Sequence, residues 1–198
     1  MKRWTRSLIL ASASPRRQFL LQRLGLPFRI EVSAAAESAS GHLTPRENCL
    51  ANAGAKARAV AQRFPEALVI GADTEVALGN AVFGKPRDLR EAASFLTRLA
   101  GRTHEVITGV SLVCAKAHYR VSFAEITRVT FHPLTKAQIA AYVRAVRTLD
   151  KAGAYAVQER GEELIEAIQG SLTNVVGLPL GALRRALEAA PDGVRLAS

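Results

Sequence analysis

The sequence predicts an α/β fold built on a mixed β-sheet, and three observations support this prediction. Short apolar runs with strand character alternate along the chain with segments whose apolar residues recur at helical spacing. Two long segments rich in Val, Ile, Thr and Phe, residues 104–114 and 119–131, follow each other directly and are typical of an antiparallel pair. Apolar residues make up 48% of the 198 residues and charged ones 22%, a composition typical of a globular chain with a sizeable core. Alternation alone favours a parallel sheet, so the antiparallel pair makes the predicted sheet mixed.

The first predicted elements are a short strand over residues 7–11 and a helix that ends near Gly25. Ser14 is a good N-cap for this helix, and a proline follows it at the first helical position. Arg16 and Arg17 then fall in the first turn, where positive charge opposes the helix dipole. This electrostatic misfit, together with the backbone N–H groups of a helix start, indicates an anion-binding site. Two solvated arginines are the alternative, and it stays open here.

The N-terminus imitates a short signal peptide, but its apolar core at residues 8–11 is shorter than the ~7–15 residues that such a segment needs. No apolar run approaches the ~20 residues of a membrane span. Cys49 and Cys114 lack metal-ligand spacing, and so small a number of cysteines fits a reducing compartment. We therefore expect a cytoplasmic protein without a membrane partner.

The net charge of +10, from 27 basic and 17 acidic residues, invites a nucleic-acid interpretation. The basic residues are, however, dispersed through the predicted helices, and no basic run is interleaved with aromatic residues. Excess positive charge suits a small polyanionic substrate equally well. Nucleic acid is therefore not the expected partner, although a nucleotide- or nucleic-acid-binding regulator remains the alternative to an enzyme.

A second strand is predicted over residues 28–32, and a small polar loop that contains Glu37 follows it. Thr44 and Glu47 form a capping-box pattern with proline at the first helical position. The pattern predicts a long Ala-rich helix to about Phe64, and this helix carries Lys56. A lysine on such a helix is usually solvated, so Lys56 alone indicates little.

The apolar run at residues 68–70 predicts a strand buried on both faces. Gly71, Ala72, Asp73 and Thr74 follow it, and Lys85 comes twelve residues after Asp73. A carboxylate and an amine at the rim of a buried sheet suit a site for a metal-bound anion. The alternative is that Asp73 is a turn or helix-cap residue.

Between these residues, Gly-Asn at positions 79–80 predicts a hairpin. Residues 79–85 also spell G-x-x-x-x-G-K, the start of a phosphate-binding P-loop. Pro86 stands where that motif needs Ser or Thr, and it disfavours helical geometry at Lys85. The segment therefore is not a P-loop.

The remaining chain predicts three helices, one strand and one loop. The helices run from Asp88 to about Leu99, from Thr135 through Val146, and from about residue 180 to about Ala189; the strand covers residues 162–168 and the loop residues 170–174.

Six stretches together resemble the Maf family of nucleoside triphosphate pyrophosphatases. They are LILASASPRRQFLLQRLG, the A-x-x-K-A pattern at residues 53–57, GADTEV, FGKPRDLREAASFLTRLAGRTHEVITGV, LDKAGAYAVQ and GSLTNVVGLPL, in the family's order from Leu8 to about Leu187. The resemblance implies one domain over residues 1–198, with two lobes on an elongated mixed sheet and an active site in the cleft between them. It also implies hydrolysis of a nucleoside triphosphate to the monophosphate and pyrophosphate with Mg²⁺ or Mn²⁺, by a homodimer. Ala72-Asp73-Thr74 and Gln158 match the pattern of members that act on dTTP and UTP.

The resemblance implies a role for each matching residue. Asp73 corresponds to the family's proton acceptor, or holds the metal with Glu37 as second ligand. Lys56 and Lys85 add positive charge along the triphosphate and complete the catalytic set. The expected substrate-binding residues are Ser12, Ser14, Arg16, Arg17, Thr74 and Gln158.

The sequence departs from the family's pattern in three places. Ala36 precedes the expected metal ligand where many relatives have a second acid. Glu75 replaces an apolar residue and shares a strand face with Asp73, so it is either an extra metal ligand or a solvated edge residue. Glu159 puts a carboxylate beside Gln158, which leaves the preferred nucleobase open. Other motif residues are expected to be structural: Gly153 and Gly177 as backbone positions, Tyr155 in the core, and Asp150 with Lys151 as a salt bridge.

Overall fold

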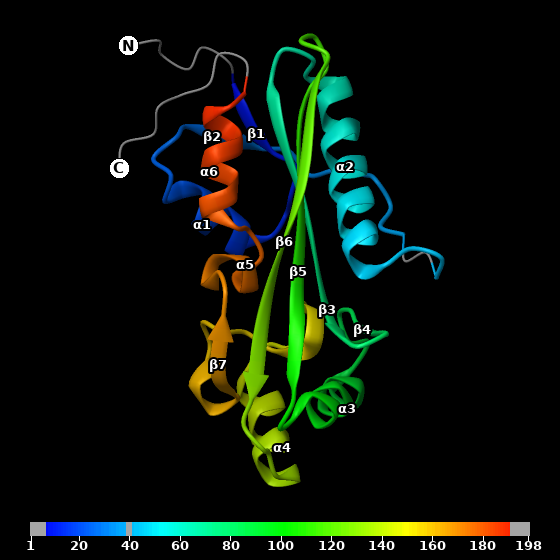
Figure 1. Ribbon diagram of the computed structural model, residues 1–198, viewed down its shortest axis with the longest axis vertical. Helices are drawn as coiled ribbons and strands as arrows, with labels where there is room; N and C mark the ends of the chain where they lie inside the picture. The colour runs from blue at the N-terminus through cyan, green and yellow to red at the C-terminus, as the bar shows by residue number, and fades with distance from the viewer. Residues whose placement is uncertain (1–6, 39–40, 191–198) are drawn as a thin grey trace. The chain divides into compact units, whose positions relative to one another are not determined.

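The structure is a computed structural model that describes residues 7–38 and 41–190 (Figure 1). Its first half contains β1 (Leu8–Leu10), α1 (Pro15–Gln22), β2 (Phe28–Ile30), α2 (Pro45–Arg63), β3 (Leu68–Leu78) and β4 (Ala81–Phe83). Its second half contains α3 (Leu89–Leu99), β5 (Thr103–Cys114), β6 (Tyr119–Phe131), α4 (Lys136–Ala145), β7 (Ile165–Gln169), α5 (Leu172–Val176) and α6 (Leu180–Glu188), with short 3₁₀ turns η1 (Ala152–Ala154) and η2 (Gly161–Glu163) before β7.

The strands form one sheet in the order β2-β1-β3-β5-β6-β7, and β4 also pairs with β3. β1 runs parallel to both β2 and β3, whereas the β3–β4 and β6–β7 pairs are antiparallel. The prediction of a mixed α/β fold is therefore confirmed. Parallel pairing needs long crossovers, and α1 and α2 provide them.

The chain divides into two compact units. The first consists of Met1–Asp73, Thr108–Glu125 and Gly177–Ser198, and the second of Thr74–Ile107 and Ile126–Val176. In the first unit, buried aliphatic residues of β1 and β3 pack against small residues of α2, among them Ile9, Val69, Ala57, Val60 and Ala61. The core of the second unit is richer in aromatic residues and includes Phe83, Phe131, Tyr142 and Tyr155. The expected core position of Tyr155 is confirmed.

The predicted helix starts at Thr44 and Thr135 are confirmed. At Thr44 the hydroxyl accepts the N–H of Glu47, whose carboxylate accepts the N–H of Thr44, so the capping box closes in both directions. Thr135 and Gln138 make the same pair of hydrogen bonds at the start of α4. These caps satisfy N–H groups that a helix start leaves without an intrahelical partner.

Three local predictions were wrong. β3 continues to Leu78, because Val76 to Leu78 pair with β4, so Asp73 lies inside a strand and not at its end. Residues 170–174 are not a loop throughout, since α5 begins at Leu172, where the Ser171 hydroxyl accepts the N–H of Asn174. The strand predicted from residue 162 begins only at Ile165, because residues 161–163 form η2.

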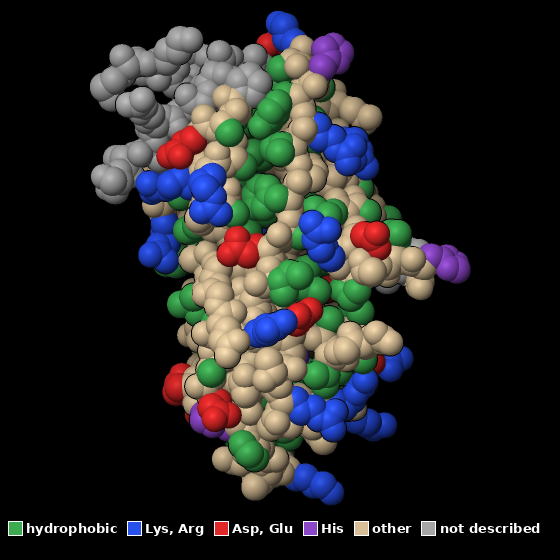
Figure 2. Space-filling view, viewed as in Figure 1, with side chains coloured by type: hydrophobic (Ala, Val, Ile, Leu, Met, Phe, Trp, Pro, Cys, Tyr) green, Lys and Arg blue, Asp and Glu red, His purple; other side chains and the backbone are tan. Residues whose placement is uncertain are grey.

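Two properties of the described residues bear on the kind of partner. None of their helices is both long enough and apolar enough to span a bilayer. On the face that Figure 2 shows, Lys and Arg side chains lie dispersed among acidic and apolar ones and do not gather in a single basic field. A duplex-binding stripe is therefore not apparent on this face.

Candidate active site

Two glycines bring α2 unusually close to the sheet in the first unit. A Cβ at Gly71 of β3 would lie 2.2 Å from the carbonyl oxygen of Ala53, and a Cβ at Gly109 of β5 would lie 2.5 Å from that of Cys49. Only residues without a side chain permit these contacts between helix and strand backbones. The Ala-rich sequence of α2 thus lies directly against β3 and β5 (Figure 1).

This packing turns one stripe of α2 toward Asp73. Cys49, Asn52 and Lys56 recur at spacings of three and four residues, so they share a helix face, and they are 0%, 5% and 8% exposed. A lysine and an asparagine at such depth require hydrogen-bond partners. The partners come from β3 and from the segment before α2.

Lys56 links the two predicted acidic residues. Its Nζ lies 2.7 Å from Asp73 Oδ1 and 2.6 Å from Glu37 Oε1, and a third hydrogen bond of 3.4 Å reaches the carbonyl oxygen of Ala72. The ammonium group has three N–H donors, and each has an acceptor here. The structure therefore brings Lys56, Asp73 and Glu37 together, although Lys56 was uninformative by itself in the sequence.

Asn52 belongs to the same group, and the sequence analysis did not identify it. Its amide donates to Asp73 Oδ2 at 3.0 Å. Its position four residues before Lys56, on the same face of a predicted helix, is the signal that would have indicated it.

Arg17 reaches this group from α1. Its Nη1 donates to the carbonyl oxygen of Ala72 at 2.9 Å, and its Nε to that of Gly177 at 2.8 Å. Burial lowers the pKa of the Arg17 guanidinium, while the nearby carboxylates of Asp73 and Glu37 raise it. Gly177 has a φ of 120°, which agrees with its expected role as a backbone position.

The other residues of the first turn surround Arg17. Ser12 is buried, and its hydroxyl lies 3.5 Å from Arg17 Nη1. Ser14 is at the N-cap position, but its side chain makes no capping hydrogen bond, and its N–H donates to the Ser12 hydroxyl instead. Arg16 is half-buried beside Arg17, and its charge lowers the pKa of the Arg17 guanidinium.

The second unit contains Thr74, Lys85 and Gln158. Thr74 follows Asp73 on β3 and is half-buried, whereas Lys85 and Gln158 are exposed. The segments around Lys85 and Gly153 are joined, because the Gly153 N–H donates to the Gly84 carbonyl oxygen at 3.2 Å. That these residues act together with Asp73 stays a prediction.

The neighbourhood of Gln158 contains a buried lysine. Lys151 is 4% exposed, and its Nζ lies 3.0 Å from Asp150 Oδ1 and 3.2 Å from Glu159 Oε1, so the expected Asp150–Lys151 salt bridge is confirmed. The Glu159 carboxylate, whose presence beside Gln158 left the preferred nucleobase undecided, thus forms an ion pair with Lys151. Gly153 has a φ of 72°, and a Cβ there would lie 3.0 Å from Val76, which makes it the backbone position expected.

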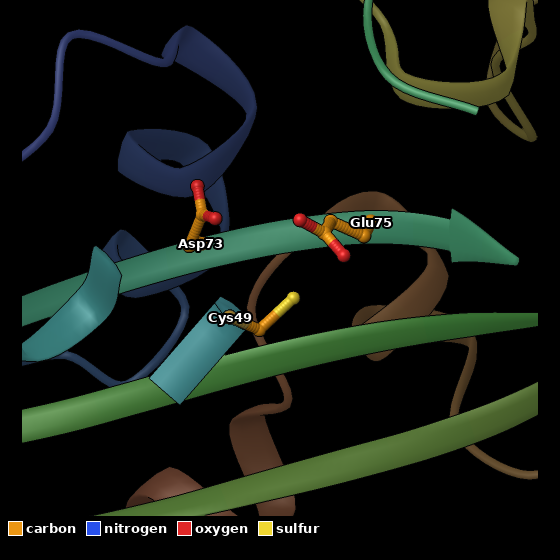
Figure 3. Close-up of side chains that lie close together, drawn as sticks. All are labelled: Cys49, Asp73 and Glu75. Carbon is orange, nitrogen blue, oxygen red and sulfur yellow. The ribbon is translucent and has the colours of Figure 1, made fainter. Parts of the chain in front are cut away.

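The chain offers several donors for a divalent metal. Figure 3 shows Asp73 and Glu75 on β3 and Cys49 on α2. The Cys49 thiol and a Glu75 oxygen each lie within 4.8 Å of an Asp73 oxygen. Glu75 is half-buried in a central strand, and one of its oxygens is inaccessible to solvent. The interpretation of Glu75 as a solvated edge residue was therefore wrong. Carboxylate oxygens suit Mg²⁺ and Mn²⁺, whereas the softer thiol suits transition metals, so the carboxylates of this donor set fit the expected ion.

Comparison with known proteins identifies a family and its members. Residues 7–190 match the sequence model of the family described as Maf-like protein. The chain is 53% identical over 174 residues to the dTTP/UTP pyrophosphatase of Moorella thermoacetica, covering 87% of this chain and 89% of that protein. It is 45% identical over 185 residues to the dTTP/UTP pyrophosphatase of Bacillus velezensis, covering 93% and 96%. A HAM1 protein from Coxiella burnetii aligns over 64% of this chain and 73% of its own, with a TM-score of 0.47 and 17% identity. The matched residues include Arg17, Glu37, Asn52, Lys56 and Asp73, which form the group described above.

Proposed function

Because this chain belongs to the Maf family, we propose that it is a nucleoside triphosphate pyrophosphatase that converts dTTP and UTP to the monophosphate and pyrophosphate. The observation that carries the proposal is the meeting of two cations at one backbone carbonyl. Lys56 from α2 and Arg17 from α1 both donate to the Ala72 oxygen, directly beside the Asp73 carboxylate. Fixed cations next to a carboxylate suit the hydrolysis of a polyphosphate.

In the proposed reaction, water attacks the α-phosphorus and pyrophosphate leaves. Negative charge then spreads over the phosphate oxygens, so catalysis depends mainly on position and electrostatics. Arg17 and Arg16 would bind phosphate oxygens, with the Ser12–Ser14 turn beside them. Lys56 and Lys85 would neutralise negative charge along the triphosphate. Asp73 would accept the proton of the attacking water at a carboxylate oxygen that Lys56 and Asn52 hold in place.

A divalent ion is part of the proposal. Asp73 and Glu37 would hold Mg²⁺ or Mn²⁺, with Glu75 as an additional oxygen ligand, and such an ion neutralises phosphate charge and lowers the pKa of bound water. Lys56 lies between Asp73 and Glu37, which agrees with a place where positive charge is favoured.

Thr74 and Gln158 are the proposed contacts to the pyrimidine. Both supply hydrogen-bond donors and acceptors, and the family resemblance implies that residues of these types at these positions accompany action on dTTP and UTP. Because Glu159 is paired with Lys151, its carboxylate need not repel a base held by Gln158. We also propose that the protein is cytoplasmic, as its composition predicts, and a homodimer, as the resemblance implies. Sedimentation of the purified chain would measure its oligomeric state.

The test is the product pattern of the purified protein with a panel of nucleoside triphosphates and either Mg²⁺ or Mn²⁺. We expect monophosphate and pyrophosphate, with dTTP and UTP consumed faster than purine nucleotides. Water labelled with ¹⁸O should deliver its label to the monophosphate. Release of orthophosphate and a diphosphate would refute cleavage at the α–β bond.

A matched pair of variants tests the role of Asp73. Asp73→Asn keeps the shape but removes the charge, and we expect turnover to fall by at least about 10²-fold. Asp88→Asn is the control, since Asp88 caps α3 in the second unit and Asn is an equally good N-cap. Turnover of Asp73→Asn equal to that of the control would remove Asp73 from the mechanism.

A further inference from the structure

The Asn52 side chain is a buried amide whose every polar atom is used. Its Nδ2 donates to Asp73 Oδ2 at 3.0 Å and to the carbonyl oxygen of Ser38 at 3.1 Å, and its Oδ1 accepts the N–H of Ser38 at 3.0 Å. A primary amide offers two N–H donors and one carbonyl acceptor, so its hydrogen bonds match that inventory. Leaving a buried polar group without a partner costs about 1–3 kcal/mol, which makes this position specific for an amide.

The two hydrogen bonds to Ser38 matter because Glu37 is the residue before it. Residues 33–38 form no helix or strand, and the Glu37 side chain is 51% exposed. Its carboxylate nevertheless lies 2.6 Å from Lys56 Nζ. The paired hydrogen bonds from Asn52 fix the backbone next to Glu37 against α2, and this accounts for so short a contact from an irregular segment.

The third hydrogen bond fixes the plane of the Asp73 carboxylate. Lys56 holds Oδ1 and Asn52 holds Oδ2, and the two residues lie one helical turn apart on α2. A carboxylate held at both oxygens has little freedom to rotate. A displacement of a reacting group by about 1 Å lowers the rate on the order of 10²-fold, so the orientation of the Asp73 carboxylate affects the rate of the reaction.

We infer that Asn52 is a positioning residue, which orients Asp73 and anchors the segment that carries Glu37. The inference rests on the proposed function, because Asp73 must take part in the reaction for its orientation to affect turnover. It differs from that proposal in assigning a role to a residue that the proposed reaction itself does not use.

The first test does not depend on activity. Hydrogen exchange of the Ser38 amide should be slow in the unaltered protein and markedly faster in Asn52→Leu, which has a similar shape and no hydrogen bonds. In Asn52→Asp, a side-chain oxygen can still accept the Ser38 N–H, so part of the protection should remain. Equal exchange in all three proteins would overturn the anchoring role.

The second test is kinetic, with melting temperatures measured alongside. We expect kcat of Asn52→Leu and of Asn52→Asp to fall about 10–100-fold, as for other residues that orient a reactive group, while KM changes by less than about threefold. Asn48→Leu, which removes a buried amide one turn earlier on the same helix, is the control for the loss of any buried amide from α2. If Asn52→Leu fails to fold, Asn52→Asp carries the comparison.

Wild-type kcat in Asn52→Asp, or a loss in Asn52→Leu no larger than in Asn48→Leu, would overturn the positioning role. An unaltered protein that releases no pyrophosphate would refute the proposed function instead, and the exchange experiment would still decide the anchoring role. The failures of the two proposals are therefore distinguishable.

Discussion

Acidification should destabilise the second unit through His104. This residue is 1% exposed and packs edge-on against Phe131 and Tyr155, with ring centroids 4.7 and 5.5 Å away. Its Nε2 forms a 2.9 Å hydrogen bond with the Tyr155 hydroxyl. Burial lowers the pKa of His104 from 6.5 to about 4, because the charged ring would lose its hydration among these aromatic groups.

The sign and the size of the effect follow from that pKa. Between pH 6.5 and about 4 the unfolded chain binds a proton at this residue that the folded chain does not. The contribution of His104 to stability is therefore complete above pH 6.5 and is lost as the pH falls toward 4. The difference of about 2.5 pH units, at about 1.4 kcal/mol each, corresponds to about 3 kcal/mol of unfolding free energy.

The assay is urea unfolding followed by far-ultraviolet circular dichroism at several pH values between 7 and 4. His104→Gln stays neutral over this range and keeps a group that can hydrogen-bond to Tyr155. We expect the unaltered protein to lose about 3 kcal/mol more than this variant on acidification, since the other titrating groups are common to both. His118→Asn is the control, because His118 is exposed at a left-handed backbone position that Asn tolerates. Identical pH dependence of the unaltered protein and His104→Gln would refute the argument.

Three further substitutions test how the group around Asp73 is built. Gly71→Ala would place a Cβ 2.2 Å from the Ala53 carbonyl oxygen and push α2 from the sheet. We therefore expect the unfolding free energy to fall by about 1–3 kcal/mol and kcat/KM to fall at least tenfold. Gly41→Ala is the control, because no atom lies within 4 Å of the added Cβ, and it should match the unaltered protein in both measurements. Thr44→Ala should cost about 1 kcal/mol in urea unfolding through loss of the cap on α2, and restoration by Thr44→Ser would tie the loss to the hydroxyl. Lys56→Met removes the ammonium group that pairs with the buried Asp73 carboxylate, so we expect the unfolding free energy to fall by about 3–5 kcal/mol and turnover to fall below detection. A variant that is both stable and active would contradict this expectation.

Much of the local structure could be predicted from the sequence alone. The helix starts at Thr44 and Thr135 and the hairpin after β3 depend on residues two to four positions apart, so short patterns specify them. The burial of residues 68–70 follows from their branched apolar side chains. The motif stretches indicate Asp73 as a candidate site residue, and its part in a reaction stays a prediction.

The assembly of the site was decided by the tertiary structure. Asn52 and Ser38 are 14 positions apart, Lys56 and Asp73 are 17 apart, and the Arg17 side chain binds a carbonyl 160 positions away. No short-range pattern encodes such contacts, and the one between Lys56 and Asp73 also needs the close approach of α2 to β3 at Gly71. The chain by itself determined which charged groups are present and which elements carry them. The close packing of helix on sheet determined which of them meet, since an ammonium or a carboxylate out of water is stable only with partners that the folded core supplies.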